Sequence, residues 1–266
     1  MLPIPDSFKN VLGLGKPKQV YPVRKSTKWG NVIGAVLLLV GGGVVLLWGV
    51  WETYTRWQAN GPAVIVKTIT TPLIISGFAF LFGLLLAWNA YSSWKKAAVL
   101  YENGFAYQDR KGLHTARWDE VSSMTAAVTR HYTNGVYTGT THVYTIFKKD
   151  STKIILNDSI QKVEEVASTI RGGVYPLLYQ LYAQSYNAGK PVSFGPVVLS
   201  KIDGIQIGKK SYPWDQVSKV SIHQGFVQVA KKGGGWFSGA SAAAATIPNL
   251  EVMLSIIDQV VGVATK

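Results

Sequence analysis

The sequence contains no cysteine among its 266 residues. This absence excludes disulfide bonds, cysteine-ligated zinc and a thiol nucleophile. Histidine is scarce, with four residues, and charged side chains make up only 15% of the chain, against roughly 25% in soluble proteins. Apolar side chains make up 47%. A chain with this composition is neither disordered nor typical of a wholly soluble protein.

Two long stretches carry no formal charge: 22 residues from Gly30 to Trp51 and 27 residues from Thr68 to Trp94. About 20 apolar residues cross the core of a bilayer. We therefore expect spans over about 31–51 and 71–93, within a two-helix transmembrane hairpin of residues 30–94. Tryptophan and tyrosine flank both stretches, as in the aromatic belts of membrane proteins. Pro72 is expected near the start of the second span, where its missing N–H costs least.

The formal net charge of +13 is distributed unevenly. Residues 97–266 hold 17 basic and 12 acidic side chains, so only +5 lies there. The remainder lies in a basic tail, residues 1–29, and in the hairpin, which favours an anionic membrane surface over nucleic acid as the partner. By the positive-inside rule, we expect a multi-pass protein of the plasma (cytoplasmic) membrane. Both termini are then cytoplasmic, and the link at about 52–67 lies outside.

Small residues recur four apart on the two expected spans. Such spacing allows helices to approach closely. It can pack the two spans together or form a homo-oligomer, and both alternatives stay open. The residues concerned are Gly30, Gly34, Ala79, Gly83 and Ala87.

Residues 97–266 contain a degenerate internal repeat. Each copy begins at a turn, Asn103-Gly104 or Asp203-Gly204, and continues to a Trp-Asp-Glu/Gln-Val-Ser segment that starts at Trp118 or Trp214. Asn-Gly and Asp-Gly favour tight turns between strands. The repeat therefore predicts two copies of one strand-rich module.

Each copy is expected to end in a helix. Asp158 is the predicted cap of the first helix and Asn249 that of the second. Gly172-Gly173 is expected to interrupt the first helix, and Pro176 permits a restart. A tyrosine stripe then follows at helical spacing, and we interpret it as packing between the modules: Tyr175, Tyr179, Tyr182 and Tyr186.

Three segments, 101–104, 118–121 and 235–250, resemble the bacterial pleckstrin-homology-like domains. The arrangement as a whole resembles an uncharacterised bacterial family with two membrane spans and a tandem of such domains. The resemblance implies an α+β fold. It predicts two PH-like modules, over 97–171 and 195–264, which are joined by a helical connector, 172–192. Each module is an antiparallel meander or barrel with a C-terminal helix. The resemblance also implies a surface that binds lipid headgroups or protein segments, and it brings no catalytic residues.

The sequence contains none of the common phosphate-loop, nucleophile-elbow or zinc-protease motifs. His131 and His142 could face each other across a hairpin, but a metal site needs a third ligand. Asp119, Glu120 and Asp215 follow the repeated tryptophans, a position that suggests hydrogen bonding at strand ends. We therefore expect no enzyme, no cofactor and no metal.

The candidate binding residues are basic and aromatic. Lysine doublets are expected at hairpin ends, where they keep strand edges soluble or contact phosphate. An aromatic pair in a glycine-rich loop, residues 233–246, can dip into a membrane interface or close the module. The residues are Lys209, Lys210, Lys231, Lys232, Trp236 and Phe237.

The predicted function is a non-catalytic scaffold or protein-interaction surface at the cytoplasmic membrane face. The first alternative is recognition of an anionic lipid headgroup by the second module. An enzyme of unknown reaction is the second alternative.

Overall fold

The computed structural model describes residues 5–9, 11–233 and 239–265. These residues group into two compact units. The helical unit contains residues 22–97 and 108–112, and the sheet unit contains the rest. The predicted modules 97–171 and 195–264 both fall, apart from residues 97 and 108–112, within the sheet unit. The protein is therefore a mixed helical and sheet structure with two N-terminal helices.

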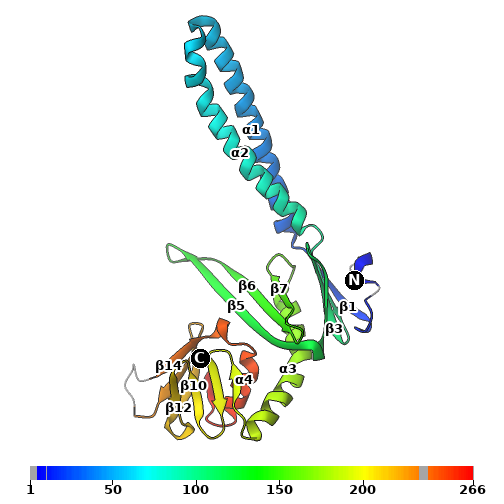
Figure 1. The fold of residues 1–266 in the computed structure, drawn as a ribbon, viewed down its shortest axis with the longest axis vertical. Helices are drawn as coiled ribbons and strands as arrows, with labels where there is room; N and C mark the ends of the chain where they lie inside the picture. Colours follow the sequence, from blue (N-terminus) through cyan, green and yellow to red (C-terminus); the bar gives the residue numbers. More distant parts are fainter. Residues whose placement is uncertain (1–4, 10, 234–238, 266) are drawn as a thin grey trace. The chain divides into compact units, whose positions relative to one another are not determined.

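The helical unit is an antiparallel pair, α1 (Lys25–Asn60) and α2 (Ile65–Ser93), joined by Gly61 and the short η2 (Pro62–Val64) (Figure 1). Both helices are long and apolar enough to cross a membrane. With 36 residues, α1 is about 54 Å long, well beyond the ~30 Å core of a bilayer. Both helices continue through most of the expected link, about 52–67, and the chain turns at Gly61 and η2.

Small residues lie where α1 and α2 touch. A Cβ added to Gly34 or Gly83 would lie 3.0 Å or 2.8 Å from a leucine of the other helix, and one added to Gly42 would lie 2.9 Å from the Cβ of Ala79. Gly30, by contrast, faces open space. Part of the predicted stripe therefore packs the two helices against each other.

Pro72 lies inside α2 rather than near its start, which corrects the prediction. The error arises because the helix begins at Ile65, seven residues earlier. The buried ring fits because Gly49 of α1 lies opposite: an added Cβ there would be 2.2 Å from the Pro72 Cβ. The missing side chain on α1 thus makes room for the proline.

The sheet unit consists of two halves whose elements follow the same order. The first half begins with a sheet of order β1-β2-β3-β4, and the second begins with β8-β9-β10-β11. The bounds are β1 (Pro17–Pro22), β2 (Ala97–Tyr101), β3 (Gly104–Asp109), β4 (Gly112–Arg117), β8 (Val192–Phe194), β9 (Val197–Ser200), β10 (Gly204–Ile207) and β11 (Lys210–Tyr212).

A short 3-10 turn and a second sheet follow in each half. The turns are η3 (Trp118–Glu120) and η4 (Trp214–Gln216). The first half then has β5 (Val121–Thr133), β6 (Val136–Lys148) and β7 (Lys153–Asn157). The second half has β12 (Val217–His223), β13 (Phe226–Lys231), β14 (Ala240–Ala243) and β15 (Val263–Thr265), in the order β14-β13-β12-β15.

The repeated tryptophans perform the same local task in both halves. The indole Nε1 of Trp118 donates to the Glu102 carbonyl at 3.0 Å, and that of Trp214 donates to the Ser200 carbonyl at 2.8 Å. In each half this bond ties the 3-10 turn to the end of the second strand. The strand after the turn then has a register shift, at Val121 and at Val217.

The N-terminal segment is folded, so the prediction of a tail over residues 1–29 is wrong. The segment forms η1 (Asp6–Phe8) and β1, and Phe8, Leu14 and Tyr21 are buried. The Tyr101 hydroxyl donates to the Phe8 carbonyl at 2.8 Å. The error arises because β1 finds its partner, β2, beyond the whole helical hairpin.

The first half closes with one uninterrupted helix, α3 (Val163–Asn187). The expected break at Gly172-Gly173 is wrong, and Pro176 lies inside the helix. The indole ring of Trp118 accounts for the glycine at position 173, because a Cβ there would lie 2.7 Å from the ring. The expected cap, Asp158, is wrong as well. The helix begins directly after Lys162, whose backbone has a left-handed conformation.

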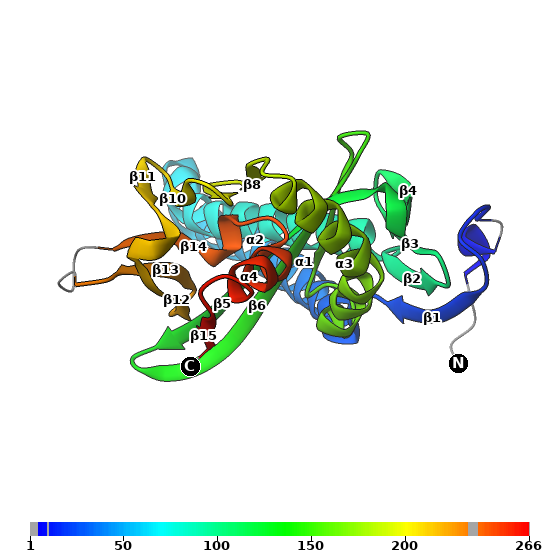
Figure 2. The ribbon, with the colours of Figure 1, turned by 90° about the horizontal axis from the view of Figure 1, so that it is seen from below.

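The second half continues with η5 (Ala244–Thr246) and α4 (Leu250–Asp258), which lies beside α3 (Figure 2), and ends with β15. Asn249 stands at the predicted cap position but makes no capping bond. A single buried core extends through both halves and includes Phe105 and Ile146 from the first half, and Phe194 and Ile257 from the second. The two halves therefore fold as one body.

Candidate functional site

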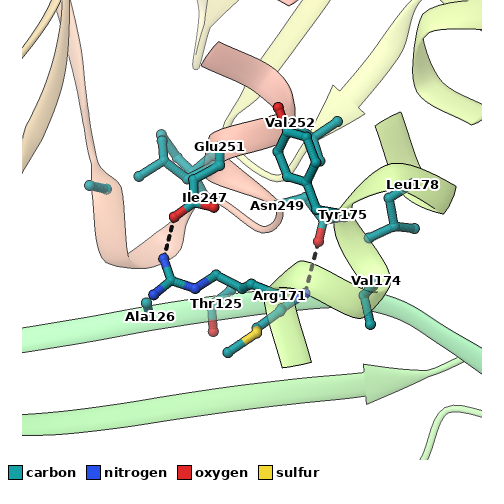
Figure 3. A pocket seen from close by; sticks show the side chains of 13 residues that line it. Thr125, Ala126, Arg171, Val174, Tyr175, Leu178, Ile247, Asn249, Glu251 and Val252 are labelled. Atoms are coloured by element: carbon teal, nitrogen blue, oxygen red, sulfur yellow. Dashed lines mark hydrogen bonds and ion pairs between the residues drawn. The ribbon is translucent and has the colours of Figure 1, made fainter. Parts of the chain in front are cut away.

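A small apolar cavity of about 80 Å³ lies between the two halves (Figure 3). Three elements build it: β5, α3, and the segment that runs from η5 into α4. Its apolar wall comes from both halves: Met124, Ala126, Val174, Leu178, Ile247 and Val252. A cavity of about 150 Å³ holds benzene, so this one accommodates a single small apolar group.

Arg171 and Tyr175, two polar residues that line the cavity, both have partners on α4. Arg171 on α3 forms an ion pair with Glu251 on α4, and the Tyr175 hydroxyl hydrogen-bonds to Ser255. Both interactions join α3 to α4. Burying a small apolar group here therefore breaks no existing polar contact, whereas a charged ligand would have to displace the ion pair.

Asn249 supports the floor of the cavity. Its Oδ1 accepts the Met124 N–H at 2.9 Å, and its Nδ2 donates to the Ser122 carbonyl at 3.3 Å. The backbone N–H of Asn249 donates to the Met124 carbonyl at 2.8 Å. The side chain expected to cap α4 instead joins α4 to β5 of the first half. Sequence reasoning missed this role because nothing in the local pattern shows a partner 125 residues away.

The tyrosine stripe packs against the core, as interpreted. The Tyr175 and Tyr179 rings stack with centroids 6.0 Å apart, and Tyr182 stacks on Phe194 at 4.7 Å. Burial raises the pKa of Tyr186. The stripe thus belongs to the contact between α3 and the second half.

Two of the predicted basic residues lie together. Lys209 and Lys210 border an open depression of about 540 Å³ between the β10–β11 turn and β14. The Lys210 Nζ donates to the Gly239 carbonyl at 3.2 Å, so one of the two ammonium groups is held beside the depression. An anion of the size of a phosphate can enter this open space.

The other predicted residues are not brought to this depression. Lys231 and Lys232 are exposed at the end of β13 and do not border it. Trp236 and Phe237 lie outside the described residues. Part of the expected loop, residues 233–246, is ordered, since Ala240–Ala243 forms β14 and pairs with β13.

The two histidines expected to face each other do not. The register places His131 opposite Gly139 and His142 opposite Val128. His142 instead lies between two carboxylates, with its Nδ1 3.0 Å from Asp158 and its Nε2 in contact with Glu164. Asp158 also accepts the His142 backbone N–H at 2.6 Å, which is why it does not cap α3.

The acidic residues beside the repeated tryptophan have structural partners. Asp119 pairs with the Arg117 guanidinium at 3.0 Å, and Glu120 accepts the Arg117 N–H at 3.2 Å. Glu120 also lies 3.6 Å from the Lys148 Nζ. The interpretation of these two carboxylates as strand-end hydrogen-bonding groups is confirmed.

A further contact holds β1 onto α3. The Tyr21 hydroxyl and the Gln19 amide both donate to Glu165 Oε1, at 3.0 Å and 3.1 Å. Burial and the neighbouring Glu165 raise the pKa of Tyr21. Hydrogen bonds from Lys162 and then Tyr21 lower the pKa of Glu165. The segment that precedes α1 is thereby fixed to the sheet unit.

The model of one protein family matches residues 8–264, which is nearly the whole chain; it is described as a family of unknown function (DUF6585). No match was found among curated proteins.

Proposed function

The chain belongs to the DUF6585 family, whose function is unknown, and we propose that it is a membrane-tethered, non-catalytic protein that presents a binding surface. In this proposal α1 and α2 anchor the protein in the plasma membrane. The sheet unit, read as two tandem modules of the bacterial pleckstrin-homology-like type, holds its partner at the cytoplasmic face.

The pairing of β1 with β2 carries the proposal. β1 leads into α1, β2 follows α2, and the two strands are neighbours in one sheet. The backbone N–H groups of Glu102 and Asn103 donate to the carbonyls of Lys16 and Leu14, at 3.1 Å and 2.9 Å. A hairpin whose two ends lead into paired strands has both ends on one side of any bilayer it crosses. Its surplus of basic residues at that end favours the cytoplasmic side.

The correspondence of the two halves supports the interpretation as tandem modules. Strand order, 3-10 turn, tryptophan bond and closing helix recur in the same sequence. The pleckstrin-homology-like fold serves other proteins as a binding surface, which is an analogy at the level of the fold.

The cavity between the halves is the proposed partner site. Its size and apolar wall suit one small apolar side chain of a protein segment, and the Arg171–Glu251 pair at the cavity suits polar groups beside it. In cells, a photoreactive residue at Leu250 is expected to crosslink to the partner. Ala126→Trp fills the cavity and is expected to abolish the adduct. Ala245→Trp, at an exposed position beside the cavity, is the matched control and should retain the adduct.

The absence of cysteine makes the topology directly testable. Single cysteines are introduced at Ala59 near the hairpin turn, and at the exposed Leu12 and Ile202 of the sheet unit. A membrane-impermeant maleimide added to whole cells should label only Ala59→Cys, and the other two should react after permeabilisation. Labelling of Leu12→Cys and Ala59→Cys from the same side would contradict the proposal.

Headgroup recognition is the second candidate, favoured by the position of Lys209 and Lys210 at the open depression. The full chain in detergent micelles should bind soluble dioctanoyl phosphatidylglycerol more tightly than the phosphatidylcholine analogue, and less tightly at high salt. Lys209→Gln/Lys210→Gln should remove this difference. Lys231→Gln/Lys232→Gln removes the same charge outside the depression and should preserve it. Equal binding of both lipids by the unaltered chain would eliminate this candidate.

A further inference from the structure

The helical unit contains a groove of about 470 Å³ beside the turn that joins α1 and α2. One face of α1 forms one wall, because its residues recur at helical spacing. The opposite wall comes from η2 and the first three turns of α2. The lining residues are Val45, Trp48, Glu52, Arg56 and Asn60 on the α1 side, and Val64, Lys67, Thr68, Thr71, Pro72 and Ile75 on the other.

The polarity of the groove changes along its length. Val45 and Ile75 line the end that lies within the charge-free stretches, whereas Arg56, Asn60 and Lys67 line the end beside the turn. Along α1 the lining extends from residue 45 to residue 60, which is about 22 Å along the helix axis. A bilayer is ~40–45 Å thick with its headgroups. The groove is therefore about as long as one leaflet is thick. Its apolar end corresponds to the acyl-chain region of a leaflet, and its polar end corresponds to the headgroup region.

The polar end carries a positive charge. Two cations, Arg56 and Lys67, and one carboxylate, Glu52, line it, so their formal sum is +1. Glu52 Oε1 lies 2.6 Å from Arg56 Nη2. The Asn60 amide donates to the Arg56 carbonyl at 3.2 Å. The ion pair holds the guanidinium at the groove, where part of its donor set remains for an anion.

The two helices are in close contact beside the apolar part of the groove. Gly49 and Pro72 touch there, and the proline ring occupies the space that a side chain on Gly49 would need. The buried Thr53 hydroxyl donates to the Gly49 carbonyl at 2.7 Å, within its own helix. It therefore contributes no polar group to the groove, and the wall near Pro72 suits an acyl chain.

We propose that this groove binds one glycerophospholipid, with its phosphate between Arg56 and Lys67 and an acyl chain along Val45 and Ile75. The proposal rests on the membrane-spanning part of the proposed function. The bound lipid belongs to the leaflet at the turn end of the hairpin, opposite to the sheet unit in the topology proposed above. The carboxylate of Glu52 at the polar end is compatible with the amine of an ethanolamine headgroup. The group that the site recognises is therefore the phosphate, which the different phospholipids share.

The full chain, purified in mild detergent and delipidated, is titrated with dioleoyl phosphatidylglycerol and followed by native mass spectrometry. One lipid per chain is expected. Arg56→Gln/Lys67→Gln removes both cations at similar side-chain size and should raise the dissociation constant about tenfold or more. Lys95→Gln/Lys96→Gln removes the same charge at the other end of the hairpin and should leave it unchanged. Equal losses for both double variants would overturn the site.

Further probes identify the recognised group. Phosphatidylethanolamine should bind about as tightly as phosphatidylglycerol, whereas dioleoylglycerol, which lacks phosphate, should bind at least tenfold more weakly. Equal binding of dioleoylglycerol, or displacement of the lipid by millimolar inorganic phosphate, would overturn the proposal. A narrowed apolar end, in Val45→Phe, should weaken lipid binding without altering the size-exclusion profile.

Failure of this site can be told apart from failure of the proposed function. A chain that needs detergent for solubility and retains no phospholipid contradicts the groove alone. A chain that stays soluble and monodisperse without detergent contradicts the membrane anchor and the groove together.

Discussion

The two halves of the sheet unit share their order of elements and differ in what is attached to them. In the first half, the helical hairpin separates β1 from β2, whereas β8 and β9 of the second half follow each other directly. In the first half, β5 and β6 have 13 residues each, against 7 and 6 for β12 and β13. The first half also has the longer closing helix. The shared framework tolerates a large insertion at one connection because strand pairing, not chain continuity, holds its parts together.

Substitutions at the tightest point of that framework should have a large effect on the free energy of unfolding. A Cβ on Gly104 would lie 2.2 Å from the Ala116 carbonyl oxygen, and one on Gly204 would lie 2.0 Å from the Tyr212 oxygen. Alanine at either position must displace backbone, at a cost of about 1–3 kcal/mol. Gly204 has φ +94°, so Gly204→Ala should be the worse of the two. Thermal unfolding of the full chain in detergent measures both.

The matched control is Gly172→Ala on α3, where an added Cβ meets nothing within 4 Å. It should leave the chain unchanged or stabilise it by about 1 kcal/mol, because alanine favours helix. If Gly204→Ala destabilises the chain and Gly104→Ala does not, the two glycines are not equivalent in the two halves.

Asn249 tests whether the halves depend on each other. Asn249→Ala leaves the Met124 N–H without its acceptor, which costs about 1–3 kcal/mol for a buried donor. Alanine is also strained at φ 51°, whereas Asn249→Gly relieves that strain and still loses the bond. If Asn249→Gly is as stable as the unaltered chain, the bond contributes nothing. Appearance of two separate unfolding transitions would show that this contact joins the halves into one cooperative body.

The tie of β1 to α3 predicts a pH effect in the first half only. The folded-state pKa of Glu165 is lowered, so its contribution is fully present above about pH 5 and is lost as the pH falls through the folded value. Protection of β1 amides from hydrogen exchange should therefore decrease on acidification, while that of β8 stays constant. In Glu165→Gln the β1 protection should be low throughout and independent of pH. A pH response that persists in this variant would assign the effect to another group.

Local patterns predicted much of this structure. The charge-free stretches gave the two helices, and Asn134-Gly135 forms the expected turn, with φ 50° and 80°. Two of the misses share one cause, which is a partner far away in sequence. β1 pairs with a strand beyond the hairpin, and Asn249 serves β5 of the other half.

The candidate sites show the same limit. Lys209 and Lys210 are adjacent in sequence, so their shared location was predictable from their turn. The cavity between the halves was not, because its wall combines β5, α3 and the start of α4. Asp158 also illustrates this limit. Its spacing from the helix suits a cap, but its carboxylate accepts the backbone N–H of His142 across the sheet instead. Competition between local and distant partners decides such residues.

The long hairpin of β5 and β6 should show the smallest effect on stability. Beyond Val143, which pairs with Asn157, β7 no longer covers β6, and a two-stranded ribbon is marginally stable at best. Tyr132 is 60% exposed at its end and makes an edge-to-face contact with Tyr137. Tyr132→Ser should therefore change the free energy of unfolding by no more than about 0.5 kcal/mol.

The covered part of the same hairpin provides the contrast. Ile146 lies on β6 where β7 pairs with it, and it is fully buried. Ile146→Ala should cost about 2–5 kcal/mol. If Tyr132→Ser approaches that cost, the ribbon belongs to the folding core and the two halves differ in framework, not only in attachments. If it is neutral, the extra residues of β5 and β6 are free for a role outside stability, which the shorter β12 and β13 lack.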